Sequence, residues 1–103
     1  MLKHCVYVNF KAEVSEQECR AAVSAFAELL GKVEGMMDFS AGPNLDFENK
    51  SAQYGWGFVI TFADRAALAA YDAHPLHQRY GAQMVTLAQG GADGIIVFDL
   101  QTN

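Results

Sequence analysis

The stretch Tyr54-Gly55-Trp56-Gly57-Phe58-Val59-Ile60-Thr61-Phe62 carries the clearest structural signal in the chain. Large apolar side chains occupy every second position, and smaller residues such as Gly55 and Gly57 stand between them. A period of two residues is typical of a β-strand, because successive side chains point to opposite faces. We therefore predict a strand over residues 54–62 whose large side chains face a thick apolar layer. The glycines on the other face leave room for another backbone or a bulky side chain.

Three more segments have the composition of strands: residues 3–10, 36–42 and 95–100. In the first of them, one face carries four side chains: His4, Val6, Val8 and Phe10. The opposite face is not strongly polar, so we expect both faces of this strand to be covered. Residues 43–52 are polar and rich in turn-forming residues, which predicts the longest loop of the chain.

The segments between the predicted strands contain residues that typically begin or end helices. Ser15 and Glu18 form a capping box that predicts a helix from Glu16, with Gly31 as its C-terminal cap. Asp64 caps a second helix after residues 54–62. Pro75 interrupts that helix and can occupy the first turn of a further one over residues 75–88.

The resulting order is βαββαβ with the second helix split in two. It predicts an α+β, ferredoxin-like fold in which one helical layer covers a four-stranded antiparallel sheet. At 103 residues, we expect a single domain spanning residues 1–103. The second face of the sheet needs cover, and only 18% of residues are charged. We therefore predict a homodimer that forms through the sheet face.

Composition argues against several classes of partner. The net charge is −5 and there is no basic run, which argues against nucleic-acid binding. No apolar run approaches the roughly 20 residues of a membrane span. Cys5 and Cys19 match no metal-ligand or redox spacing. Because the chain enters a strand directly, without a signal-peptide pattern, we expect a reduced, cytoplasmic protein.

The stretch Tyr71-Asp72-Ala73-His74-Pro75-Leu76-His77 places a phenol and two imidazoles within seven residues. Histidine titrates near neutral pH, and a phenol can donate or accept a hydrogen bond, so the pattern favours acid–base chemistry on a small molecule. His4 and Trp56 can lie on the side of the sheet under the helices. We hypothesise that His77 is a general base for a carbon next to a carbonyl. Tyr71 would then hydrogen-bond the enolate oxygen or return the proton, while His4 orients one of the two.

Each of these residues also has a structural interpretation. His74 precedes Pro75, and capping the following helix is its favoured role over contact with substrate. Tyr71 shares a helical face with Leu68 and can be a core residue, while His77 can equally pack in the core. His4 can pair with a backbone carbonyl. A zinc or iron site is not expected, since His74 and His77 lack a third ligand at a suitable spacing.

Several of these segments together resemble the stress-responsive α/β-barrel (Dabb) domain family. The resemblance lies in Lys3-His4, the capped helix, Gly42, Tyr54, the run from Phe62 to Tyr71, the stretch His74-Pro75-Leu76-His77, and Val97-Phe98-Asp99 in the last strand. It covers essentially the whole chain, and its sharpest element is Tyr-x-x-His-Pro-x-His.

The resemblance implies a homodimer in which two sheets pack face to face as a dimeric α+β barrel. It also implies a ligand cavity between each sheet and its helices. A plant member is a polyketide cyclase that performs an aldol condensation. Its catalytic tyrosine and histidine match Tyr71 and His77, and other site histidines match His4 and His74. Trp56 replaces a further site histidine, so we expect a different substrate.

We therefore expect a cofactor-free cyclase or isomerase for a small apolar or aromatic carbonyl compound. Tyr71 and His77 are its expected catalytic residues, and His4, Trp56 and His74 its expected substrate contacts. Two other functions fit the same family. One is a non-catalytic, ligand-binding or stress-associated dimer. The other is a cofactor-independent monooxygenase of polycyclic phenols, which Trp56 and the aromatic strand would suit.

Overall fold

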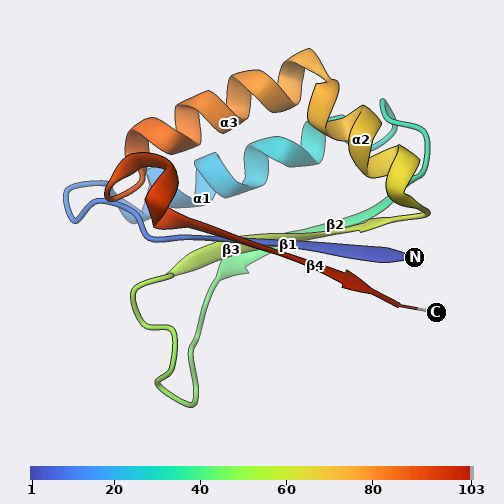
Figure 1. The fold of residues 1–103 in the computed structure, drawn as a ribbon. Helices are drawn as coiled ribbons and strands as arrows, with labels where there is room; N and C mark the ends of the chain where they lie inside the picture. Colours follow the sequence, from blue (N-terminus) through green and yellow to red (C-terminus); the bar gives the residue numbers. More distant parts are fainter. Residues whose placement is uncertain (103) are drawn as a thin grey trace.

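A computed structural model describes residues 1–102. Its four strands form one antiparallel sheet in the order β2-β3-β1-β4. The helices all lie on one face of that sheet (Figure 1). The elements, in chain order, are β1 Leu2–Val8, α1 Glu16–Ser24, η1 Ala25–Leu29, β2 Met36–Pro43, β3 Trp56–Phe62, α2 Arg65–Ala73, α3 Pro75–Leu87, η2 Gly91–Gly94 and β4 Ile95–Gln101. The predicted α+β, ferredoxin-like arrangement with a split second helix is confirmed.

The first helix begins where the capping box predicts but ends earlier. The Ser15 hydroxyl accepts a hydrogen bond from the Glu18 amide at 3.1 Å, and the Glu18 carboxylate accepts one from the Ser15 amide at 3.1 Å. After Ser24 the chain tightens into the 3₁₀ turn η1. Its two buried side chains, Phe26 and Leu29, are three residues apart, and a 3₁₀ helix places such residues on one side. Gly31, with φ +89°, follows the turn.

Two strand ends differ from the prediction by two residues, because the backbone there bonds to a loop or a turn instead of a neighbouring strand. Strand β3 begins at Trp56, since the Tyr54 amide donates to the Ser51 carbonyl at 2.9 Å within the preceding loop. Strand β1 ends at Val8, since the Asn9 amide donates to the Gly94 carbonyl at 2.8 Å. Phe10 makes only an isolated bridge with Ala88.

The core lies between the sheet and the helical layer. Val8, Ile60 and Phe62 are fully buried there, and Phe26 stacks on Phe58 with 4.6 Å between the ring centroids. Helix α1 packs over β2 and β3, and α3 packs over α1 and η1. The helical layer is therefore centred away from β4, whose inward-facing Val97 remains 48% exposed.

The other face of the sheet carries no helix, and we call it the open face. The ring of Tyr7 lies across Gly57 there, so close that a Cβ at Gly57 would be 2.3 Å from Tyr7 Cδ1. This contact is the close approach that the alternating glycines predict. Phe98 and Leu100, on the same face of β4, are 56% and 60% exposed. A large apolar surface therefore needs a cover that one chain does not supply.

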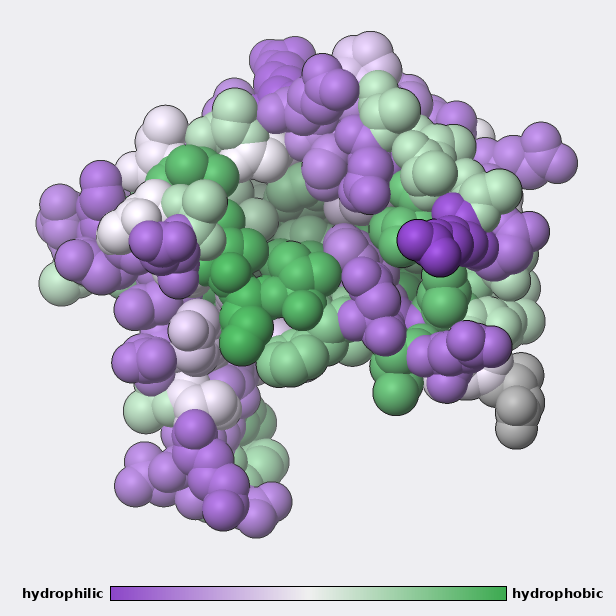
Figure 2. Space-filling view, viewed as in Figure 1, coloured by the Kyte–Doolittle hydropathy of each residue, from purple (hydrophilic) through white to green (hydrophobic). Residues whose placement is uncertain are grey.

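The loop between β2 and β3 projects away from the helices, on the side of the open face (Figure 1). In the space-filling view it forms a mostly hydrophilic arm below the body of the molecule (Figure 2). Within residues 1–102, no helix has the length and apolar character needed to cross a membrane.

Candidate functional site

The junction between α2 and α3 brings Tyr71 and His77 together. Tyr71 lies in the last turn of α2 and His77 in the first turn of α3. Between them, His74 has the extended backbone that Pro75 favours in the residue before it, with φ −67° and ψ 136°. This break turns α3 so that the two rings face each other, with centroids 4.6 Å apart and planes inclined by 59°.

Both residues bury a polar atom that lacks a partner. Tyr71 is 0% exposed, and neither its hydroxyl nor His77 Nδ1 has a hydrogen-bond partner among the described residues. Burial raises the pKa of the Tyr71 phenol, and the negative charge of Asp72 adds to that shift. Burial lowers the pKa of His77, although Asp72 opposes the change. At neutral pH the site therefore holds a protonated phenol and an uncharged imidazole.

His4 reaches the same site from β1. Its ring lies 5.8 Å from that of Tyr71 and 6.1 Å from that of Phe62, centroid to centroid. His4 Nδ1 and Asp99 Oδ1 are 2.6 Å apart, because β1 and β4 place the two residues opposite each other. The buried imidazole is thus held by a carboxylate rather than by the backbone carbonyl that the structural interpretation suggests.

These side chains line one cavity of about 360 Å³. Its wall is completed by apolar residues of the core and of β4, and the cavity opens where the helical layer leaves β4 uncovered. Figure 2 shows apolar side chains around a recess above β4. The lining residues are His4, Val6, Phe26, Phe58, Tyr71, Asp72, His77, Gly81, Met84, Ile95, Val97 and Asp99.

Two of the residues expected to bind substrate lie elsewhere. Trp56 is on the helical side of the sheet, but it pairs with Val8 at the far end of β1, whereas His4 pairs with Ile60. The Trp56 ring packs under the guanidinium of Arg20, 4.8 Å from its carbon to the ring centroid. It does not line the cavity around Tyr71.

His74 is the helix cap that its position before Pro75 favours. Its Nδ1 accepts a hydrogen bond from the Leu76 amide at 3.1 Å, at the start of α3. It is also absent from the lining of the cavity. The structure therefore brings His4, Tyr71 and His77 together and leaves Trp56 and His74 outside the group.

Asp99 also lines the site, although the sequence patterns give it no role there. The alternation of inward-facing and outward-facing residues in β4 could have predicted the position of Asp99. Ile95 and Val97 face inward, and Asp99 continues that face. A carboxylate on the inward face of a strand needs a partner, and the antiparallel pairing supplies His4.

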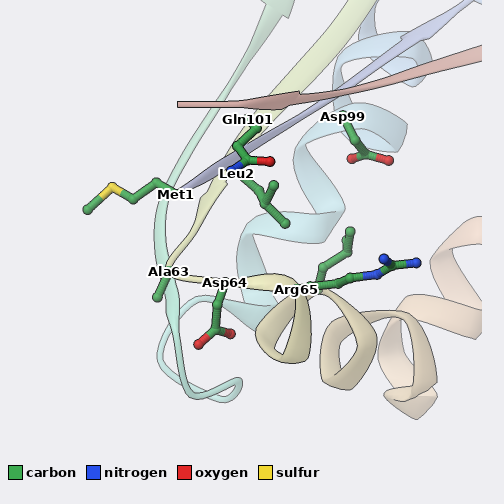
Figure 3. Close-up of a pocket in the computed structure, with 8 residues that line it drawn as sticks. Met1, Leu2, Ala63, Asp64, Arg65, Asp99 and Gln101 are labelled. Atoms are coloured by element: carbon green, nitrogen blue, oxygen red, sulfur yellow. The ribbon is translucent and has the colours of Figure 1, made fainter. Parts of the chain in front are cut away.

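A second hollow of about 510 Å³ adjoins the site on the other side of Asp99. It lies between the start of α2 and the ends of β1 and β4, and Asp99 lines both hollows. In Figure 3 the Asp99 carboxylate and the Arg65 side chain project into it. Among the described residues, no three His, Cys, Asp or Glu side chains lie close enough together to hold a metal ion.

Residues 2–102 match the Stress responsive A/B Barrel Domain (Dabb) family. The chain belongs to this family. It is 31% identical over 98 residues to stress-response A/B barrel domain-containing protein HS1 of Arabidopsis thaliana, covering 95% of this chain and 86% of that one. It is 25% identical over 80 residues to olivetolic acid cyclase of Cannabis sativa, covering 78% and 79%. A dimeric ferredoxin-like protein from Jannaschia sp. CCS1 superposes with a TM-score of 0.90 at 42% identity, covering 98% of each chain.

The half-buried imidazole of His77 is expected to make the stability of this Dabb domain depend on pH. Because the pKa of His77 is lowered on folding, the unfolded chain binds more protons below its ordinary pKa of about 6.5. The free energy of unfolding is then expected to fall as the pH drops from 7.5 to 5.5. Urea titrations at both pH values measure the loss, and a His77→Gln variant should lose less stability than the wild type. An equal loss in both proteins would assign the pH dependence to other groups.

Proposed function

We propose that this Dabb domain binds a small carbonyl compound and moves a proton at the carbon next to the carbonyl, without a cofactor. The supporting observation is the pair of buried polar atoms, Tyr71 Oη and His77 Nδ1, that lack partners beside a cavity. Buried polar groups are nearly always hydrogen-bonded, so an unpartnered pair in a cavity wall points to a ligand that supplies the missing partners.

His77 is the proposed base. Its Nε2 lies 3.7 Å from Asp72 Oδ1, which favours the tautomer with hydrogen on Nε2. Nδ1 then carries a free lone pair inside the site. This atom would take the proton from the substrate carbon, and the electron pair of the broken C–H bond would move to the carbonyl oxygen. An imidazole that is uncharged at neutral pH suits this role.

Tyr71 is the proposed stabiliser of the resulting enolate. Its raised pKa keeps the phenol protonated, so its hydroxyl can donate a hydrogen bond to the oxygen that gains charge. His77 then either returns the proton to a different carbon of the conjugated enolate, or the enolate carbon attacks a second carbonyl of the same molecule, whose oxygen takes the proton from His77. The first outcome is an isomerisation, and the second is an aldol cyclisation. His4, held by Asp99, would fix the position of the Tyr71 ring.

The relatives support this chemistry and indicate the class of substrate. Olivetolic acid cyclase carries a cyclisation in its name, and the match spans 78% of the present chain. The cavity here, about 360 Å³ and walled mainly by Val6, Phe26, Phe58, Met84 and Ile95, suits a small apolar or aromatic molecule.

We also propose that the protein is a homodimer that forms through its open face. The Jannaschia protein, which shares 42% of its sequence with this chain, is described as dimeric. The exposed Phe98 and Leu100 of the open face would be covered by the same face of a second copy, as a two-fold interface requires.

Hydrogen–deuterium exchange at carbon tests the catalytic proposal without knowledge of the natural substrate. A phenyl alkyl ketone is incubated with the protein in D₂O, and the loss of its α-CH signal is followed by NMR. We expect exchange well above the rate in buffer, with a limb of falling rate at acid pH as His77 becomes charged. Binding of the ketone without exchange would favour a ligand-binding dimer instead. Oxygen uptake with a polycyclic phenol would favour the monooxygenase.

A further inference from the structure

We propose that the loop of residues 44–54 is a rigid arm that clasps the second copy of this chain, with Leu45 and Phe47 as its contact residues. The proposal rests on the homodimer proposed above. It adds a contact outside the paired sheets, and its test separates the failure of the clasp from the failure of the dimer.

The arm is held by its own polar groups. Asp46 Oδ1 accepts hydrogen bonds from the Lys50 amide, the Ser51 amide and the Ser51 hydroxyl at 2.8, 2.9 and 3.0 Å. Asn44 Nδ2 donates to the Ser51 hydroxyl and the Tyr54 carbonyl, both at 2.9 Å. These bonds tie the two limbs together, so the loop projects as a fixed element.

Two apolar side chains stand out from this polar loop. Phe47 is 91% exposed, the largest value among the exposed large apolar residues, and Leu45 is 66% exposed. Neither side chain belongs to the core cluster of buried and partly buried apolar residues. Exposure of a phenyl ring to water is unfavourable, so a partner that covers the ring would stabilise the complex.

A second copy is the occupant that the geometry favours. The arm projects on the side of the open face (Figure 1), so a sheet packed against that face must lie beside it. Stacked sheets are about 10 Å apart. Each limb of the arm has about five residues and can reach roughly 16 Å at about 3.3 Å per residue, which is past the plane of a partner sheet.

The base of the arm is also continuous with the open face. A groove of about 430 Å³ runs between them. Its sheet side is apolar and is formed by Tyr7, Ile96 and Phe98, whereas its arm side is formed by Tyr54 and the polar residues Asn44, Lys50 and Ser51. A partner that covers Phe98 would therefore also contact the base of the arm, because the two belong to one continuous surface.

Photo-crosslinking tests the clasp directly. A photoreactive phenylalanine analogue is placed at position 47 and, as a matched control, at Leu30, which is 44% exposed and lies just after η1 in the helical layer. We expect position 47 to give a covalent dimer on irradiation and position 30 to give none. In a dilution series followed by analytical ultracentrifugation, the Leu45→Ala/Phe47→Ala variant should dissociate at a concentration at least ten times higher than Leu30→Ala.

These experiments distinguish the failure of the clasp from the failure of the dimer. A wild-type protein that is monomeric at every concentration would overturn the dimer, and the clasp with it. A stable wild-type dimer that gives no crosslink from position 47 and tolerates the double variant would overturn the clasp alone. Unfolding by urea is measured for both variants, and the fold should stay intact because Leu45 and Phe47 lie outside the core cluster.

Discussion

The Tyr71→Phe variant is expected to unfold at the same urea concentration as the wild type, or a higher one, while losing most of its turnover. The change removes one oxygen from a fully buried side chain whose hydroxyl has no hydrogen-bond partner among the described residues. A buried polar group without a partner costs about 1–3 kcal/mol, so its removal relieves a penalty in the empty site. The ring itself stays packed against Phe62 and His77.

Turnover should respond in the opposite direction. If the phenol stabilises the charge that develops on the substrate oxygen, its loss is expected to slow the reaction about 10²–10³-fold, as for other donors of this kind. The ketone exchange rate measured by NMR reports this effect. A gain in stability together with a loss of activity is typical of a group retained for function.

Tyr80→Phe is the matched control. Its hydroxyl donates to the Glu28 carboxylate on the outer surface of the helical layer, away from the cavity. The same atom is removed, and exchange should continue at the wild-type rate. If Tyr71→Phe retained full exchange activity, the phenol would be a core residue and its proposed role would be wrong. If both variants lost activity equally, the effect would be one of general stability.

The fold was predictable from local patterns. The alternation from Trp56 to Phe62, the capping box at Ser15 and the break before Pro75 each report on neighbours in sequence. The pair Tyr71 and His77 was predictable for the same reason, because six residues across a proline break is a local relation. The roles of these two residues remain proposals.

The rest of the site depends on distant pairing. Trp56 and His4 both face the helices, as their alternation predicts, but the antiparallel register sets Trp56 against Val8 and His4 against Ile60. Facing the same side therefore did not place them together. Asp99 joins His4 for the converse reason, since the register of β1 with β4 brings residues 95 positions apart within 2.6 Å. The alternation within one strand predicts which face of the sheet a side chain occupies. It does not predict which residue of the neighbouring strand lies opposite, because that depends on the register.

The Gly57→Ala variant is expected to lose about 1–3 kcal/mol of stability, because the added methyl group has no space. Its Cβ would lie 2.3 Å from Tyr7 Cδ1 and 2.7 Å from the Val6 carbonyl oxygen. The ring of Tyr7 can rotate away, but the backbone oxygen belongs to the paired central strand β1 and cannot move without distorting the sheet.

Gly42→Ala is the matched control, because Gly42 pairs with Gly57 across the same face of the sheet. A Cβ at Gly42 would meet nothing within 4 Å, so this variant should stay within about 0.5 kcal/mol of the wild type. Urea unfolding compares the two, and equal losses would mean that glycine is needed for backbone freedom rather than for contact with Tyr7. Because Tyr7 also lines the groove between the arm and the open face, its displacement in Gly57→Ala should weaken the proposed dimer as well. The difference in unfolding midpoint between the two variants should therefore widen as the protein concentration rises.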